Sequence, residues 1–195
     1  MTRLSPSEKE EQRRLLRLRL AARSQEERAA ASLRLADRLP CLPEWGAVRR
    51  VALYASLSSE PDTDLLFPRA RAEGKRVFYP FFRGAGRSLG FAEVDAVESL
   101  RPGPLRFREP PPSGGDGKVE VDLLLIPGLG FDREGMRLGR GSGYYDRTLA
   151  ETRAQILRVG YFFSWQELSK VAAEGHDERL DVVITEKETI RIRTE

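Results

Sequence analysis

Apolar positions in the first 40 residues recur at helical spacing, interrupted once by polar residues. Ser5 at a cap position and Glu8 three residues later predict a helix start, and leucines then continue the pattern to about residue 22. Ser24 and Glu27 repeat the same arrangement before a second apolar stripe, which a proline ends. The pattern therefore predicts an N-terminal helical hairpin over residues 1–40.

From residue 50 the pattern changes to short apolar runs separated by polar stretches. Runs typical of buried strands lie at residues 51–56, 77–79 (closed by Pro80), 89–94, 121–128, 156–161 and 181–185. Helical spacing lies at residues 64–73, 144–153 and 165–174, whereas the Pro- and Gly-rich stretch 101–118 is predicted to be irregular. Strands that alternate with helices form parallel sheets through right-handed crossovers. We expect one α/β domain over residues 1–195, a three-layer α/β/α fold with a largely parallel sheet.

Composition excludes several classes of protein. The chain of 195 residues is 40% hydrophobic and 32% charged, enough to build a core. A single cysteine, Cys41, excludes an intrachain disulfide, and two methionines and one histidine leave little for a zinc finger or soft-ligand metal site. No run approaches the apolar core of a signal peptide or a membrane span. We expect a soluble, cytoplasmic, monomeric protein without a membrane partner.

The positive charge is confined to the predicted hairpin. Residues 1–38 carry ten Lys/Arg against six Asp/Glu, a net +4, so the remainder of the chain, whose total is +3, is at −1. Basic helices most often present a solvated face, but a nucleic-acid-binding protein remains an alternative. Since no RNA-binding module or aromatic platform sequence is visible, we expect no nucleic-acid partner.

The densest concentration of candidate chemistry is PGLGFDREGMRLGRGSGYYDR, residues 127–147. Its six glycines follow the clearest strand and precede a helix, where backbone N–H groups can converge on phosphate oxygens. Arg137 and Arg140 add positive charge, and two tyrosines and a carboxylate follow. The Walker pattern GxxxxGK[ST] is absent, so simple loop flexibility stays open as an alternative.

This motif resembles the signature of the 5-formyltetrahydrofolate cyclo-ligase family, P-G-[LIV]-[AG]-F-D-x-x-G-x-R-L-G-x-G-x-G-Y-Y-D, which residues 127–146 match throughout. Residues 9–13 are similar to the family's K-x-x-L-R, with Gln12 replacing leucine, and residues 60–63 to its E-V-D-T, with Pro61 replacing valine. Residues 107–110 and 176–181 are similar to its I-x-E-P and H-D-x-x-L-D. The resemblance covers nearly the whole chain in the same order.

The resemblance implies ATP-dependent conversion of 5-formyltetrahydrofolate to 5,10-methenyltetrahydrofolate, with release of ADP and phosphate. A formamide carbon is a poor electrophile, so the family's expected route first phosphorylates the formyl oxygen. N10 then closes the ring and expels phosphate. The enzyme's task is charge stabilisation and alignment, with Mg²⁺ as cofactor and ATP as co-substrate.

The resemblance also implies roles for individual residues. The ATP contacts would be Lys9, Glu10, Glu11, Gln12, Arg13, Arg137, Leu138, Gly139, Arg140, Gly141, Ser142, Gly143, Tyr144 and Tyr145, with Arg140 and Tyr145 as the catalytic pair. The folate contacts would be Ala55 and Glu60, with Arg13 also near the folate, and the magnesium ligands Asp146 and Asp177. Candidate apolar walls for the folate are Phe81, Phe107, Tyr144, Tyr145 and Trp165.

Each role has a structural alternative. Asp146 could instead be a helix residue that pairs with Arg147, and Asp177 could belong to a polar turn. Lys9 and Arg13 could lie on a solvated helix face, and His176 is more simply a turn residue than a general base. A sugar-phosphate isomerase is a third class of function, which the YYD motif disfavours. If both aspartates share a metal, their charges repel when it is absent, so we expect Asp146→Asn to leave the apo protein as stable or slightly more stable. We also expect Glu60→Gln to weaken folate binding far more than ATP binding, because the Glu60 loop follows a strand distinct from the glycine loop.

Overall fold

The computed structural model describes residues 7–111, 120–152, 155–175 and 177–192. Its main sheet has seven strands in the order β11-β10-β9-β6-β1-β2-β3. In chain order these strands are β1 (Arg50–Ala52), β2 (Arg76–Phe81), β3 (Gly90–Glu93), β6 (Leu123–Ile126), β9 (Leu157–Tyr161), β10 (Val182–Ile184) and β11 (Thr189–Arg191). Two short ribbons pair β4 (Arg101–Pro102) with β5 (Arg108–Glu109), and β7 (Gly130–Phe131) with β8 (Arg137–Leu138).

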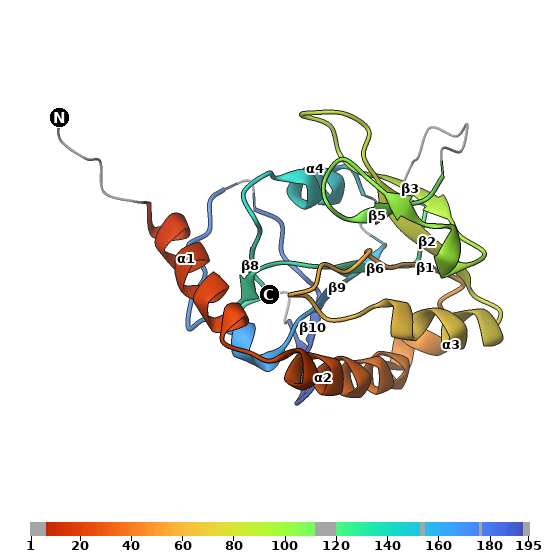
Figure 1. The fold of residues 1–195 in the computed structure, drawn as a ribbon, viewed down its shortest axis with the longest axis horizontal. Helices are drawn as coiled ribbons and strands as arrows, with labels where there is room; N and C mark the ends of the chain where they lie inside the picture. The colour runs from red at the N-terminus through yellow and green to blue at the C-terminus, as the bar shows by residue number, and fades with distance from the viewer. Residues whose placement is uncertain (1–6, 112–119, 153–154, 176, 193–195) are drawn as a thin grey trace.

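The five inner strands are parallel, and only the edge strands β3 and β11 pair antiparallel. The helices are α1 (Glu8–Ala21), α2 (Gln25–Arg38), α3 (Phe67–Ala72) and α4 (Tyr144–Glu151). Figure 1 shows α2 and α3 on one face of the sheet and α4 on the other. The predicted α/β architecture with a largely parallel sheet is confirmed. Within the described residues, no helix is long and apolar enough to cross a membrane.

The helical hairpin is part of the main hydrophobic core. Leu16 of α1 and Leu35 of α2 are fully buried in the same cluster as Val51 and Leu123, which belong to two central strands. Burying such leucine side chains stabilises the fold by about 1.5–3 kcal/mol each. The hairpin is therefore packed onto the sheet.

Both hairpin helices begin with a capping box. Ser24 and Glu27 cap α2 as predicted, but the cap of α1 is Ser7, whose side chain accepts the N–H of Glu10. The predicted cap, Ser5, lies outside the described residues. The prediction was displaced by two residues because Ser7 and Glu10 offer the same spacing one half-turn later.

Pro80 does not end its strand, as the sequence suggested, but lies inside β2 opposite Phe91 of β3. The parallel pairing of β2 with β1 extends only to Phe78, so the missing N–H of Pro80 interrupts no bond to β1. The run at 51–56 is shorter than predicted, because β1 ends at Ala52.

The helix predicted at residues 165–174 is wrong. Only a 3₁₀ turn, Ser164–Gln166, forms there; Glu167 then makes an isolated β-bridge to Phe131, and residues 168–174 form neither helix nor strand. The reason lies in its backbone donors: the N–H of Leu168 bonds to the carbonyl of Phe131, and that of Val171 to the carboxylate of Asp132. These tertiary partners replace the i−4 carbonyls that a helix would use.

Candidate active site

A pocket of about 180 Å³ opens where β1 and β6 end. In parallel sheets, ligands bind beyond the carboxyl ends of the strands. The pocket is lined by Tyr54, Ala55, Leu57, Glu60, Pro80, Leu89, Leu105, Phe107, Pro127, Gly128, Arg137, Gly139, Arg140, Ser142, Gly143, Tyr144, Tyr145 and Asp146. Residues from the glycine motif and from the loop after β1 thus share one cavity.

The glycine loop joins β8 to α4. Gly141 and Gly143 have φ values of +109° and +64°, a conformation that side chains other than glycine rarely adopt. Gly143 is also the N-cap of α4, and it provides no side chain to occupy the first N–H groups of the helix. The loop therefore presents backbone donors beside the pocket, as the sequence predicted for a phosphate-binding loop.

Arg140 and Glu60 form an ion pair across the pocket. The Arg140 Nε and Nη2 atoms lie 3.0 and 2.8 Å from Glu60 Oε1, and the Leu57 N–H donates to Glu60 Oε2 at 3.0 Å. The Glu60 side chain is only 5% exposed. Burial raises the pKa of the Glu60 carboxyl, and the Arg140 guanidinium opposes that rise. Glu60 therefore contacts the glycine loop directly, although the Glu60 loop follows a different strand.

Asp146 also has an arginine partner. The Arg137 side chain, 2% exposed, donates from Nη2 to Asp146 Oδ1, and its Nε has no partner among the described groups. Arg147, the partner suggested by sequence, instead donates to the carbonyls of Ser142 and Arg87. The sequence showed both charges of the Arg137–Asp146 pair, but their contact depends on the β8-to-α4 turn.

Asp177 lies in a different contact set from Asp146. Lys9 Nζ donates to Asp177 Oδ2 at 2.7 Å, and the pair is largely buried. Asp177 does not line the pocket, and the described residues contain no group of three or more His, Cys, Asp or Glu side chains placed to hold a metal. The sequence-based expectation assumed that Asp146 and Asp177 repel each other when no metal is bound. Each carboxylate instead contacts a basic side chain, Arg137 and Lys9 respectively, so that assumption is wrong.

Three of the five candidate residues of the first helix make tertiary contacts, although none of the five lines the pocket. Besides Lys9, Arg13 donates from Nε to the carbonyl of Gly139, 3.1 Å away, and Gln12 bonds to backbone groups at residues 170 and 172. Glu10 completes the capping box of α1, and Glu11 is exposed. Lys9 and Arg13 are thus not on a merely solvated face.

The candidate walls of the folate pocket divide into two groups. Phe107, Tyr144 and Tyr145 line the cavity, but Phe81 and Trp165 do not. The Phe81 ring lies over Gly90 at the sheet edge, and Trp165 stacks on Phe163 with centroids 4.4 Å apart. His176 lies outside the described residues.

Sequence reasoning missed several apolar lining residues. Tyr54 follows the end of β1, Pro80 lies near the end of β2, and Leu89 directly precedes β3. Leu105 lies in the loop between β4 and β5. The available signal was their position directly beside the predicted strand ends, since those ends meet at one edge of a parallel sheet.

Tyr145 combines a site position with a protonated hydroxyl. Burial and the nearby Glu60 carboxylate raise the pKa of its phenol far above the ordinary value. The Arg137 guanidinium lies 5.9 Å from the centre of its ring. At neutral pH the Tyr145 hydroxyl therefore remains a hydrogen-bond donor.

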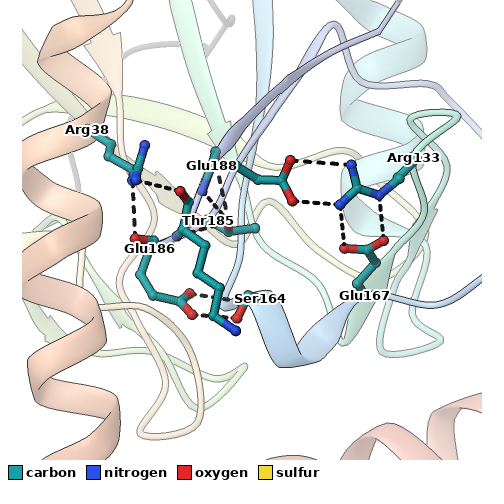
Figure 2. A network of polar contacts seen from close by, with 8 residues as sticks. Arg38, Arg133, Ser164, Glu167, Thr185, Glu186 and Glu188 are labelled. Atoms are coloured by element: carbon teal, nitrogen blue, oxygen red, sulfur yellow. Dashed lines mark hydrogen bonds and ion pairs between the residues drawn. The ribbon is translucent and has the colours of Figure 1, made fainter.

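A second polar network lies at the carboxyl ends of β9 and β10 (Figure 2). The buried Glu186 carboxylate accepts the Ser164 N–H at 2.8 Å and the Ser164 hydroxyl at 2.5 Å. Arg38 of α2 donates to the carbonyls of Glu186 and Lys187. Arg133 pairs with both Glu167 and Glu188. These contacts anchor the hairpin, β10 and the 3₁₀ turn to one another.

Comparison with known proteins finds relatives in sequence and in fold. The model of the 5-formyltetrahydrofolate cyclo-ligase family matches residues 5–186. The 5-formyltetrahydrofolate cyclo-ligase of Escherichia coli is 31% identical over 176 residues, covering 88% of this chain and 96% of the relative. The cyclo-ligase of Mycolicibacterium smegmatis is 34% identical over 149 residues, covering 73% and 76%.

A solved structure agrees. The 5,10-methenyltetrahydrofolate synthetase of Aquifex aeolicus superposes with a TM-score of 0.82 at 34% identity, covering 96% of this chain and 94% of that one. Together with the pocket built from the glycine motif, these matches show that the chain belongs to the 5-formyltetrahydrofolate cyclo-ligase family.

Proposed function

We propose that this pocket converts 5-formyltetrahydrofolate to 5,10-methenyltetrahydrofolate at the expense of ATP, with release of ADP and phosphate. Family membership supports the reaction. The observation that carries it to these residues is the meeting of Arg140 from the glycine loop with Glu60 from the loop after β1. A phosphate-binding element and a buried carboxylate for a heterocycle are thereby in one cavity.

The chemistry requires activation of a poor electrophile. The formyl oxygen attacks the γ-phosphorus of ATP and ADP leaves, which gives an iminium phosphate at N5. N10 then attacks the formyl carbon, which closes the ring; N10 loses its proton, and the C–O bond breaks so that inorganic phosphate leaves and carries this proton away. Because charge shifts onto phosphoryl oxygens, positioned cations and N–H donors contribute most of the catalysis.

The side chains of this chain divide between the two substrates. Arg140 and the first residues of α4, whose N-cap Gly143 has no side chain, line the pocket, and their N–H groups would bind phosphate oxygens. The Tyr145 hydroxyl, neutral at physiological pH, would donate to the formyl or phosphoryl oxygen. Glu60 would accept N–H groups of the pterin, a role suited to an ionised carboxylate in a buried position.

The donor set fits magnesium through Asp146. Mg²⁺ in nucleotide sites takes one or two carboxylates together with phosphate oxygens and waters, so a three-carboxylate cluster is not required. Asp146 lines the pocket and accepts a hydrogen bond from Arg137 through one oxygen, Oδ1, while Asp177 bonds to Lys9 and does not line the pocket. When bound, the ion would neutralise phosphate charge. We propose Asp146 as its ligand and Asp177 as a ligand only if it exchanges Lys9 for the metal.

The test is direct. Purified protein mixed with 5-formyltetrahydrofolate and Mg-ATP should produce the methenyl product, followed by its absorbance. Omission of ATP or addition of a chelator should abolish product formation. Product formation at an equal rate without ATP would refute the proposal.

A further inference from the structure

Gln12 departs from the family pattern, which has leucine at this position, and its side chain makes two backbone contacts. Its Nε2 donates to the carbonyl of Lys170 at 2.9 Å, and its Oε1 accepts the N–H of Ala172 at 3.0 Å. A primary amide that both donates and accepts in this way reproduces the bonding of a neighbouring β-strand. Leucine could make neither bond.

The segment that Gln12 contacts is the one where a helix was predicted. Residues 168–174 run along α1 without regular structure. Besides Gln12, both the β7–β8 turn and Lys9 hold this segment, and the Lys9 Nζ atom lies 3.3 Å from Glu174 Oε1. The Asp132 carboxylate accepts the Val171 N–H at 2.8 Å, and the Phe131 carbonyl accepts the Leu168 N–H. The segment is therefore bonded on one side by the turn and on the other by Gln12.

The helix meets this segment and the two residues that flank it, Glu167 and Asp177, at three successive levels. Near the carboxyl end of α1, Arg19 donates to the carbonyl of Glu167, whose carboxylate is held by Arg133 (Figure 2). Gln12 makes the middle contact. At the start of the helix, Lys9 reaches Asp177. Gln12 thus fixes the register between the two candidate residues Lys9 and Asp177.

Arg13 extends this arrangement to the glycine loop. It follows Gln12 directly in α1 and donates to the Gly139 carbonyl at 3.1 Å. Its guanidinium carbon would also lie 3.8 Å from a Cβ added at Gly141. A rotation or sliding of α1 would therefore displace Lys9 and Arg13 together, relative to the loop that faces the pocket.

We infer that Gln12 is a positioning residue: it docks α1 on residues 168–174 so that Lys9 and Arg13 are held against Asp177 and the glycine loop. The inference rests on the proposed function only in assigning this side of the site to Mg-ATP. The resemblance implied that Gln12 contacts ATP directly. Both polar ends of its side chain already have backbone partners, so we assign Gln12 an indirect role instead.

The test compares two substitutions with a control on the same helix. Gln12→Met keeps an unbranched side chain but removes both hydrogen bonds, whereas Gln12→Glu keeps the acceptor for the Ala172 N–H. Arg17→Met is the control, since Arg17 is exposed on α1. Amide hydrogen exchange of residues 168–174 measures docking, and steady-state kinetics measure the site.

With Gln12→Met we expect exchange at Ala172 to rise about tenfold and the KM for Mg-ATP to rise about three- to tenfold, as for the loss of one or two net hydrogen bonds. The folate KM and kcat should change by less than about twofold. The substitution weakens Mg-ATP binding equally in the ground state and in the transition state, which raises the KM for Mg-ATP and leaves kcat unchanged. Gln12→Glu should give a smaller effect, and Arg17→Met none.

Unchanged exchange in Gln12→Met, or equal rises in both KM values, would overturn the inference, and so would the same effects in Arg17→Met. If the unmodified protein forms no methenyl product, the proposed function fails on its own. The inference would then be judged by exchange and by the Mg-ATP-induced rise in melting temperature. Absence of that rise in the unmodified protein would overturn both.

Discussion

Removal of Arg140 should reveal how much the buried Glu60 carboxylate depends on its partner. Two N–H groups of Arg140 bond to one oxygen of Glu60, and a hydrogen bond to a charged group contributes about 1.5–3 kcal/mol. The Arg140 side chain is 38% exposed, so solvent screening favours the lower part of that range, about 1.5–2 kcal/mol. For a chain of this size, Arg140→Ala should lower the melting temperature by about 3–8 °C.

The loss should depend on pH with a defined sign. Burial raises the pKa of Glu60 in the folded protein above the ordinary value of 4.5, so the folded state binds this proton more tightly than the unfolded state. Stability from this group is present below pH 4.5 and is lost as pH rises through the folded pKa. Without Arg140 that pKa rises further, and the loss in the variant is therefore larger at pH 8 than at pH 5. The neighbouring phenols of Tyr54 and Tyr145 stay neutral, since burial raises the pKa of each.

The assay is urea unfolding at pH 5 and pH 8 of the wild type, Arg140→Ala, Glu60→Gln and the double variant. Glu60→Gln should restore most of the stability lost in Arg140→Ala at pH 8, because the unpaired charge is gone. Two results would refute the reasoning. One is an equal loss in Arg140→Ala at both pH values, and the other is a double variant whose loss is the sum of the single losses.

Three other substitutions test neighbouring features. Asp146→Asn should lower magnesium-dependent turnover and also lower the free energy of unfolding of the apo protein by about 1–3 kcal/mol, since it weakens the buried Arg137 pair; an unchanged magnesium dependence would leave Asp146 a purely structural partner. Asp132→Ala should lower the free energy of unfolding in urea by about 3–6 kcal/mol, because the N–H groups of Glu134, Met136 and Val171 lose their acceptor. The control Asp95→Ala, at an exposed ion pair, should lower it by under about 1 kcal/mol, and similar losses in the two variants would contradict this. Gly143→Ala should cost about 1–2 kcal/mol because its φ is +64°, and Gly46→Ala, where an added Cβ meets nothing within 4 Å, is the matched control in thermal unfolding.

Six of the seven strands of the main sheet were predictable because their apolar runs are local, whereas the edge strand β11 (Thr189–Arg191) was not predicted. The run at 121–128 contains β6, fully buried at the centre of the sheet, and the capping box of Ser24 and Glu27 begins α2 as expected. The segment 165–174 was not predictable in the same way. Its helical spacing is real, but the Asp132 carboxylate and Gln12 amide, 39 and 160 residues away from their partners, bind its N–H groups. Local propensity cannot anticipate such distant acceptors.

The candidate site shows the same division. Its residue types could be identified from the motif at 127–147, in which Gly135, Gly141 and Gly143 adopt the expected positive φ values and the other three glycines do not. The pairing of charges could not, because Arg140 meets Glu60 across 80 residues and Lys9 meets Asp177 across 168. These pairs depend on which strand ends are neighbours, and that order is set by the packing of the sheet.

The distant partners of α1 also bear on how the chain folds during synthesis. The helix leaves the ribosome first, yet the groups it binds, at Gly139, Glu167, Lys170 and Asp177, follow 126 to 168 residues later. Figure 1 shows this red helix beside the blue, late-synthesised part of the chain. Translation adds about 5–20 residues per second, so about 6–30 s pass between the synthesis of α1 and the synthesis of these partners. During that time Leu16 and Leu20 lack part of the cover that later buries them, so the nascent helix is a natural binding target for chaperones.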